Sequence, residues 1–365
     1  MDSLTKDRVL EALRTVNDPE LHRDLVSLNM VKNIAVCDGL VRVQIELTTP
    51  ACPLREPIRR DIETAIKRLR GVTRVEVDFT ARVHSAAKGP TPLPGVKNVI
   101  AVGAGKGGVG KSTVAVLTAV GLARAGASVG LLDADVYGPS IPKMMGVEDA
   151  QPAVAGPENT IIPVEAHGVR TMSIGYIISR ERPVIWRGPM IHGTIKQLLE
   201  QVMWGELDYL VVDLPPGTGD VPLTLSQSIP MTGAVVVCTP QSVALLDCVR
   251  AARMYETLKI DVLGIIENMS YFIAPDTGRE YDLFGRGGAE KAAQELGVPF
   301  LGSIPINAAV RISGDQGSPG DIFASNEQGL GTAVTRVIEN LAGRISVRNL
   351  RQPAAATASE GSGGA

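Results

Sequence analysis

Residues 105–113 read Gly-Lys-Gly-Gly-Val-Gly-Lys-Ser-Thr and match the pattern GxxxxGK[ST]. An apolar run at residues 99–102 precedes them, and residues 112–124 have the composition of a helix. In this strand–loop–helix context, glycines let backbone N–H groups converge on an anion at the helix N-terminus. The sequence therefore predicts that the loop binds the phosphates of a nucleotide. Its predicted nucleotide-binding residues are Gly105, Lys106, Gly107, Gly108, Val109, Gly110, Lys111, Ser112 and Thr113.

Three side chains of this loop have predicted roles. Lys111 is expected to neutralise the β- and γ-phosphate oxygens, and the Ser112 hydroxyl is expected to join a Mg²⁺ shell. Lys106 is an additional cation, and with it the loop resembles the deviant Walker A loop of the MinD/ParA class of P-loop ATPases. That resemblance implies that Lys106 reaches the phosphates of a partner subunit, so that hydrolysis depends on dimerisation. The alternative is an ordinary exposed loop lysine.

Acidic residues end two other apolar runs. Asp213 ends the run that begins at Tyr209, and it is predicted to hold Mg²⁺ through water. Asp133 and Asp135 end a second run; we assign Asp135 to the attacking water, as a catalytic residue with Lys106 and Lys111, and Asp133 to the Mg²⁺ neighbourhood. For each of these residues, a structural role as a cap or turn residue is the alternative.

Three further positions complete the predicted nucleotide site. Gly217 lies in the sequence PPGTG after Asp213, where its backbone N–H is placed to sense a γ-phosphate. Asn268 ends an apolar run and carries the amide donor and acceptor that an adenine edge requires. Pro305 ends a later run and is expected to flank the base. A turn role is the alternative for Asn268, and Pro305 has weaker support.

The whole chain divides into four predicted segments. Residues 97–343 alternate apolar strands with helices, which predicts an α/β P-loop NTPase with a mainly parallel sheet covered by helices on both faces. Residues 1–83 predict a small α+β domain, with a hairpin at Asp38-Gly39. Residues 84–96 are rich in proline and glycine and predict a linker, and residues 344–365 predict a disordered tail.

Composition excludes several classes of protein. The net charge of −3 gives no electrostatic reason to bind nucleic acid or an anionic membrane. The N-terminus lacks the apolar core of a signal peptide, and no apolar stretch reaches the roughly 18 residues that a membrane span needs. Four cysteines in 365 residues do not make the disulfide framework of small secreted domains. We therefore expect a cytoplasmic protein.

Longer motifs carry a closer resemblance. The ATPase motifs are DADVYGPSIP (133–142), WRGPM (186–190), WGELDYLVVDLPPGTGD (204–220), TPQSVALLD (239–247) and IIENMSYF (265–272). Together they resemble the Mrp/ApbC branch of P-loop ATPases, which are iron–sulfur cluster carriers. DPELHRDLVSLNMV (18–31) and LTTPACP (47–53) resemble the SufT-related domain often fused to them. The resemblance implies a homodimer with weak ATP and Mg²⁺-dependent turnover, which passes [4Fe–4S] clusters from the iron–sulfur assembly machinery to apo-proteins.

One departure from the family concerns its metal ligands. Family members usually carry a CPxC pair after the ENMSYF stretch, whereas this chain has Ala274 and Thr277 at the two cysteine positions. Neither side chain suits a soft iron site. Cys52 precedes a predicted helix, whose N-terminus favours the thiolate, and it is the candidate iron–sulfur ligand; a structural role is the alternative. The other cysteines, Cys37, Cys238 and Cys248, are expected to be packing residues.

Two other functions compete with cluster transfer. One is an ATP-controlled scaffold or regulator that binds no cluster and works through nucleotide-dependent dimerisation. The other is a partition-type positioning ATPase, which the sequence disfavours. Its membrane-binding members use a basic amphipathic C-terminal helix, whereas this chain ends in PAAATASEGSGGA.

Overall fold

The computed structural model describes residues 4–85, 92–155, 160–178, 188–217, 219–325 and 329–356. The chain forms two compact units. One unit joins the N-terminal residues up to His84 with the residues from Ala342 onward, and the other spans Ser85–Leu341.

The N-terminal unit is a small α+β fold. Its three-stranded sheet has the order β3-β4-β5, in which β3 and β4 form an antiparallel hairpin and β4 and β5 are parallel. The turn at Asp38-Gly39 has positive φ at both residues, as the hairpin prediction requires. Helix α2 buries Ile58, Ile62 and Ile66 in the core of this unit. Its elements are α1 (Lys6–Leu13), β1 (Asn17–Asp18), β2 (Arg23–Asp24), β3 (Val31–Cys37), β4 (Leu40–Leu47), α2 (Arg55–Lys67) and β5 (Arg74–Ala81).

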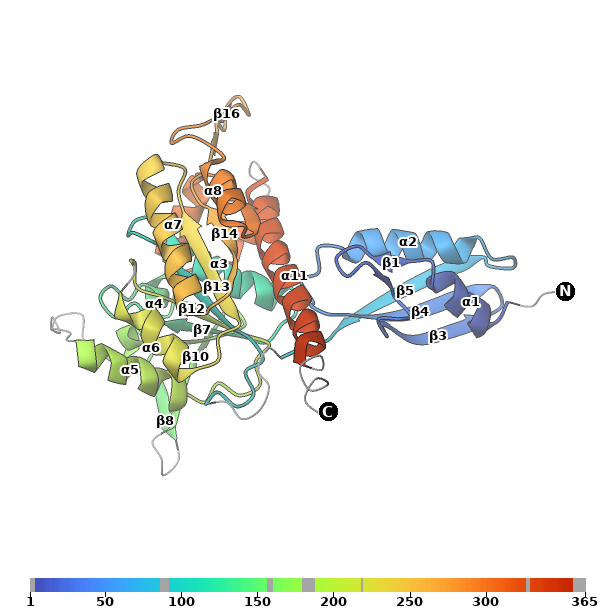
Figure 1. Ribbon diagram of the computed structural model, residues 1–365, viewed down its shortest axis with the longest axis horizontal. Coiled ribbons are helices and arrows are strands. Elements are labelled where there is room, and N and C mark those ends of the chain that lie inside the picture. Colours follow the sequence, from blue (N-terminus) through green and yellow to red (C-terminus); the bar gives the residue numbers. More distant parts are fainter. Residues whose placement is uncertain are drawn as a thin grey trace, which may run out of the picture. The chain divides into compact units, whose positions relative to one another are not determined.

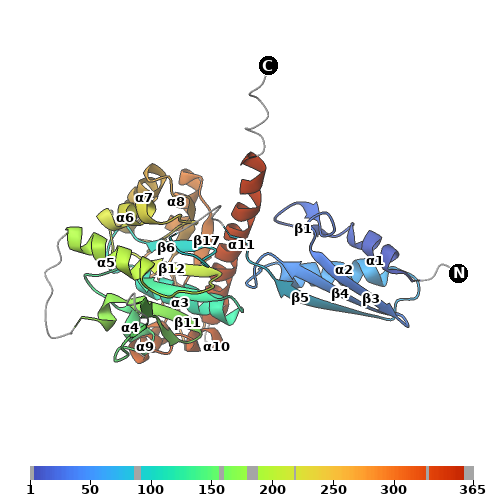
Figure 2. The ribbon, with the colours of Figure 1, turned by 90° about the horizontal axis from the view of Figure 1, so that it is seen from below.

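The larger unit is built on an eight-stranded sheet with the order β10-β11-β7-β12-β6-β13-β14-β17. Every neighbouring pair is parallel except β10 and β11. Helices lie on both faces, with α3 on one side and α6, α7 and α8 on the other (Figures 1 and 2). The predicted fold class is therefore confirmed. The strands of the sheet are β6 (Val99–Gly103), β7 (Val129–Asp133), β10 (Val164–Ala166), β11 (Val169–Ser173), β12 (Tyr209–Asp213), β13 (Gly233–Cys238), β14 (Val262–Glu267) and β17 (Phe300–Ser303).

The remaining elements of this chain connect or cover these strands. Small two-stranded pairs are formed by β8 (Ala153–Ala155) with β9 (Thr160–Ile162), and by β15 (Phe272–Ile273) with β16 (Glu280–Tyr281). The helices are α3 (Lys111–Arg124), α4 (Ile141–Met144), η1 (Ile174–Tyr176), α5 (Gly188–Glu200), α6 (Asp220–Ser228), α7 (Ser242–Thr257), α8 (Gly288–Leu296), α9 (Ala308–Gln316), α10 (Asp321–Ala324) and α11 (Leu330–Ala356). Among the described helices, none is both long enough and apolar enough to cross a membrane.

The central strands are buried on both faces, which explains their nearly continuous apolar sequences. All five residues of β6, β7 and β12 are buried. Parallel strands place their carboxyl ends at one edge of the sheet, where ligands of such folds bind. The loops that follow β6, β7, β12 and β14 therefore meet at one place.

One expectation about the segments outside the two domains needs correction. Residues 344–356 belong to α11, so the predicted disordered tail is wrong for them; residues 357–365 lie outside the described residues. Ala342 and Ile345 have no exposed surface, and a Cβ on Gly343 would lie 2.8 Å from Glu20 Oε1, so packing against the N-terminal unit extends the helix. In the predicted linker, Leu93 and Val96 are buried.

Candidate nucleotide-binding site

The loop after β6 has the backbone that its glycines allow. Gly108 and Gly110 have φ values of +82° and +80°, a region that residues with a Cβ rarely adopt. A Cβ on Gly110 would also lie 2.2 Å from Asn268 Nδ2, and one on Gly105 would lie 2.1 Å from the carbonyl oxygen of Asp247. The loop is thus packed so closely that only glycine fits at Gly105 and Gly110.

Lys111 lies at the first position of α3 and is buried against two carboxylates. Its ammonium nitrogen is 2.6 Å from Asp213 Oδ1 and 3.6 Å from Asp135 Oδ2, and it donates to Ser112 Oγ at 3.2 Å. The structure therefore brings together four residues that the sequence predicted for one site, from the ends of β6, β7 and β12.

Asp213 carries the feature that best fits a magnesium ion. Its Oδ2 atom is buried and has no hydrogen-bond partner among the described residues. Burial raises the pKa of Asp213, against the opposing effect of the Lys111 ammonium. A Mg²⁺ ion bound through Asp213 and the Ser112 hydroxyl would satisfy this oxygen and neutralise phosphate charge. The residues present thus fit the metal.

Asp133 and Asp135 differ in their surroundings. Asp133 is fully buried; its Oδ1 accepts from the backbone N–H of Asp135 at 3.1 Å, and its Oδ2 accepts from Ile141 N at 3.3 Å and Ser173 Oγ at 3.0 Å. Burial raises the pKa of Asp133 to about 7, and the neighbouring Asp213 carboxylate adds to the shift. Asp133 therefore stabilises the loop after β7 through these hydrogen bonds, and Asp135 is the one of these two aspartates that contacts Lys111.

The three outer positions of the predicted site lie at the same sheet edge or follow strands that end there. The Gly217 N–H donates to the carbonyl oxygen of Ala104 at 2.8 Å, so a γ-phosphate must compete with this hydrogen bond. Asn268 is buried, and its Nδ2 donates to the carbonyl oxygen of Val109 at 2.9 Å. Pro305 is buried after β17. Roles of Asn268 and Pro305 toward the base remain predictions.

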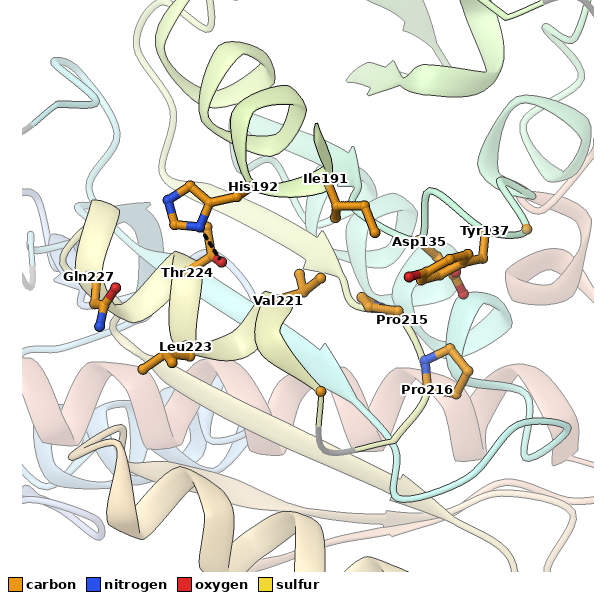
Figure 3. A pocket seen from close by; sticks show the side chains of 12 residues that line it. Asp135, Tyr137, Ile191, His192, Pro215, Pro216, Val221, Leu223, Thr224 and Gln227 are labelled. Atoms are coloured by element: carbon orange, nitrogen blue, oxygen red, sulfur yellow. Dashed lines mark hydrogen bonds between the residues drawn. The ribbon is translucent and has the colours of Figure 1, made fainter. Parts of the chain in front are cut away.

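A cavity of about 1110 Å³ adjoins the site between α5, α6 and the loops after β7 and β12. Asp135 and Tyr137 lie at one end, and His192 lies at the other, where its Nδ1 is 2.9 Å from Thr224 Oγ1 (Figure 3). The sequence around His192 does not indicate this position, because the pairing of α5 with α6 appears only in the folded chain. Residues 186–187 of the WRGPM motif lie outside the described residues.

Lys106, the lysine predicted to reach a partner subunit, is half-buried, and within the described parts of the chain it makes no ion pair or hydrogen bond. Its role toward a partner stays a prediction. Helix α7 lies against the same loop, since the carbonyl oxygen of Asp247 adjoins Gly105, and it exposes two large apolar side chains, Val243 and Leu246, at 62% and 63% of their surface. The cation and these apolar groups are available to a second molecule.

The cysteines are distributed as follows. Cys238 and Cys248 are buried, as predicted, whereas Cys37 is exposed at the end of β3, so its predicted packing role is wrong. An edge position of the small sheet, with the side chain directed to solvent, accounts for this difference. Cys52 is half-buried and packs against the core of the N-terminal unit. Ala274 is buried and Thr277 is exposed on a turn.

Comparison with known proteins gives consistent matches. The family model described as the NUBPL iron-transfer P-loop NTPase matches residues 95–344, and the model described as an iron–sulfur cluster assembly protein matches residues 6–78. An iron–sulfur cluster carrier protein of Synechocystis sp. is 51% identical over 352 residues, which cover 95% of this chain and 99% of the relative.

Solved structures agree with these matches. A nucleotide-binding protein from Archaeoglobus fulgidus, in complex with ADP, is 41% identical with a TM-score of 0.55 and covers 64% of this chain and 90% of its own. The cell-division ATPase MinD of Pyrococcus furiosus has a TM-score of 0.51 at 20% identity, over 67% of this chain and 97% of its own, which shows a shared fold.

Proposed function

The chain belongs to the NUBPL family of iron-transfer P-loop NTPases, and from this premise we propose that it is an ATPase that carries iron–sulfur clusters to apo-proteins. The observation that carries the proposal is the contact of Lys111 with Asp213 and Asp135 under a glycine loop of P-loop geometry. This arrangement binds a triphosphate with Mg²⁺ and holds the groups needed to hydrolyse it.

Different residues of the chain bind the phosphates, orient the attacking water and contact the γ-phosphate during hydrolysis. The backbone N–H groups of residues 107–112 and the Lys111 ammonium bind the phosphates. When Lys111 turns to the phosphates, Asp135 loses its contact with the ammonium and is free to orient the attacking water. The Gly217 N–H then exchanges the carbonyl oxygen of Ala104 for the γ-phosphate. Mg²⁺ supplies charge neutralisation at the phosphate oxygens.

The cargo of this ATPase is a [4Fe–4S] cluster. The positions of the usual cysteine pair hold Ala274 and Thr277, so the ligands come from elsewhere. Cys52 is the candidate within the chain, and the assembly machinery or the apo-protein client supplies the remaining thiolates. All four cysteines are free thiols, which supports a cytoplasmic site of action.

A homodimer is the proposed working form. Lys106 has no partner among the described residues, and Val243 and Leu246 on α7 expose apolar surface beside the loop. A second subunit would cover this surface and receive Lys106 at its own phosphates. The dimer would then complete two sites at once.

A second candidate is an ATP-controlled scaffold that binds no cluster. The absence of thiols at residues 274 and 277 favours it. The two candidates share the nucleotide site and differ only in whether the chain holds iron and sulfide.

Iron and acid-labile sulfide, measured after oxygen-free reconstitution of the full chain, separate these candidates. We expect visible cluster absorbance in the wild type, its loss in Cys52→Ser and its retention in Cys37→Ser, the matched control. Cluster transfer to an apo-enzyme should likewise be observed for the wild type and Cys37→Ser and be lost in Cys52→Ser. A colourless wild-type protein that still hydrolyses ATP would favour the scaffold.

A further inference from the structure

A buried carboxylate lies outside the groups that the proposed hydrolysis uses. Glu267, the last residue of β14, has no exposed surface and no cationic partner among the described ion pairs. Its Oε1 accepts from Ser270 Oγ and from the Gly287 N–H at 3.1 Å, and its Oε2 accepts from the Ala289 N–H at 2.8 Å. Three donors, two of them backbone N–H groups at the N-terminus of α8, thus satisfy one buried carboxyl group.

These donors mark the two ends of one hairpin, residues 271–286. Ser270 lies just before the hairpin and Gly287 just after it, so a single carboxylate oxygen joins the two ends. Within the hairpin, β15 pairs with β16, and Arg286 forms an ion pair with Glu280 and stacks on the Tyr271 ring at 4.6 Å. The hairpin is therefore stabilised by contacts among its own residues, and Glu267 forms hydrogen bonds to the residues at its base.

The next residue along the chain contacts the nucleotide loop. Asn268 Nδ2 donates to the carbonyl oxygen of Val109, and a Cβ on Gly110 would lie only 2.2 Å from that nitrogen. Any ordering of residues 109–110 by a bound phosphate therefore restrains Asn268. Two consecutive side chains thus connect the end of β14 to the phosphate loop on one side and to the hairpin on the other.

We propose that Glu267 is a positioning residue that couples nucleotide binding at the phosphate loop to the stability of the 271–286 hairpin. A nucleotide that orders the loop also restrains the end of β14, and Glu267 passes this restraint to both ends of the hairpin. Opening of the hairpin then becomes rarer when nucleotide is bound, without a large change of shape. The inference rests on the nucleotide binding that the proposed function requires.

A glutamine at position 267 cannot make the hydrogen bonds that Glu267 makes, because both carboxylate oxygens of Glu267 accept from backbone N–H groups. A glutamine in place of Glu267 would present an NH₂ group where either Gly287 or Ala289 now donates an N–H. One backbone donor would then lose its acceptor in a buried site. The substitution Glu267→Gln therefore disconnects the hairpin while the side-chain volume stays nearly the same.

Hydrogen–deuterium exchange of the full chain tests the coupling, with and without Mg²⁺ and a non-hydrolysable ATP analogue. In the wild type, we expect nucleotide to slow exchange across residues 271–286 by about fivefold or more. In Glu267→Gln, calorimetric nucleotide affinity should stay within about threefold of the wild type, while the effect on the hairpin disappears. If Glu267 only stabilised the hairpin, Glu267→Gln would speed exchange of residues 271–286 both with and without nucleotide. Nucleotide would then still slow this exchange by the same factor as in the wild type.

The matched control is Glu290→Gln, an exposed carboxylate in the first turn of α8, which should behave as the wild type. If Glu267→Gln does not fold, Ser270→Ala takes its place and should weaken the nucleotide effect by removing one donor. Nucleotide binding without slower exchange in the wild-type hairpin would overturn the inference, as would an undiminished effect in either variant. Absence of binding heat in the wild type would overturn the proposed function and the inference with it.

Discussion

At the residue scale, the central feature of the site is the Lys111 ammonium, which lies between two buried carboxylates. Lys111 is the cation that compensates Asp213 and Asp135, and the phosphates of a nucleotide would compete with them for it. Removing one member of such a buried pair costs about 3–5 kcal/mol, because the remaining charge is left uncompensated. Lys111 therefore contributes to the stability of the fold as well as to nucleotide binding.

The glycines of the loop give a prediction at this scale. Gly110→Ala places a Cβ at 2.2 Å from Asn268 Nδ2 and in a positive-φ conformation, whereas a Cβ on Gly107 would meet nothing closer than Pro216 at 4.0 Å. We expect Gly110→Ala to lose about 2 kcal/mol or more in the free energy of unfolding and to lose nucleotide binding, since strain and clash add. Gly107→Ala should change stability by less than about 0.5 kcal/mol. Denaturant titration compares the two, and equal stability would contradict the packing described.

Sequence alone predicted the meeting of Lys111, Asp135 and Asp213, because parallel strands end at one edge. It did not predict that Asn268 holds the loop, since this contact depends on how closely β14 approaches Val109 in space. Nor did it identify Glu267, although a carboxylate that ends the apolar run VLGII was visible. Such a residue has several possible partners until the chain is folded.

At the element scale, periodicity predicted the buried strands and the helices between them. It failed at α11, where the residues after Leu341 are small or polar and carry a weak apolar pattern. The helix continues because Ala342 and Ile345 become buried and Asn349 Nδ2 donates to the carbonyl oxygen of His84 at 2.9 Å. Tertiary packing thus decides a segment that composition placed in a disordered tail.

This packing can be tested by Ile345→Ala. Ile345 is fully buried, so truncating it to alanine leaves a cavity. We expect the free energy of unfolding to fall by about 2–5 kcal/mol. Arg344→Lys, at an exposed position next to Ile345 on the same helix, is the control and should change the free energy of unfolding by less than about 0.5 kcal/mol. Chemical denaturation of the full chain gives both values. A neutral Ile345→Ala would restore the sequence-based expectation of a disordered tail.

At the scale of the whole molecule, Lys106 has no interaction within the nucleotide site of its own chain, among the described residues. The lysine belongs to the phosphate loop, yet among the described residues nothing pairs with it. In the proposed homodimer it reaches the phosphates of the other subunit, so each complete site contains Lys111 and Asp135 from one chain and Lys106 from its partner. Activity then belongs to pairs of chains, and mixing experiments can detect this.

Two inactive variants should therefore restore each other. Lys106→Ala leaves its own Asp135 intact, and Asp135→Asn still offers Lys106 to a partner, so a mixed dimer has one complete site. Random mixing makes about half of the dimers mixed, and we expect about a quarter of the wild-type ATPase rate. Lys106→Ala mixed with the double variant Lys106→Ala/Asp135→Asn is the control and should stay inactive. If the first mixture stays inactive although its chains exchange, Lys106 acts within its own subunit, because only a cation donated across the interface can complement its loss.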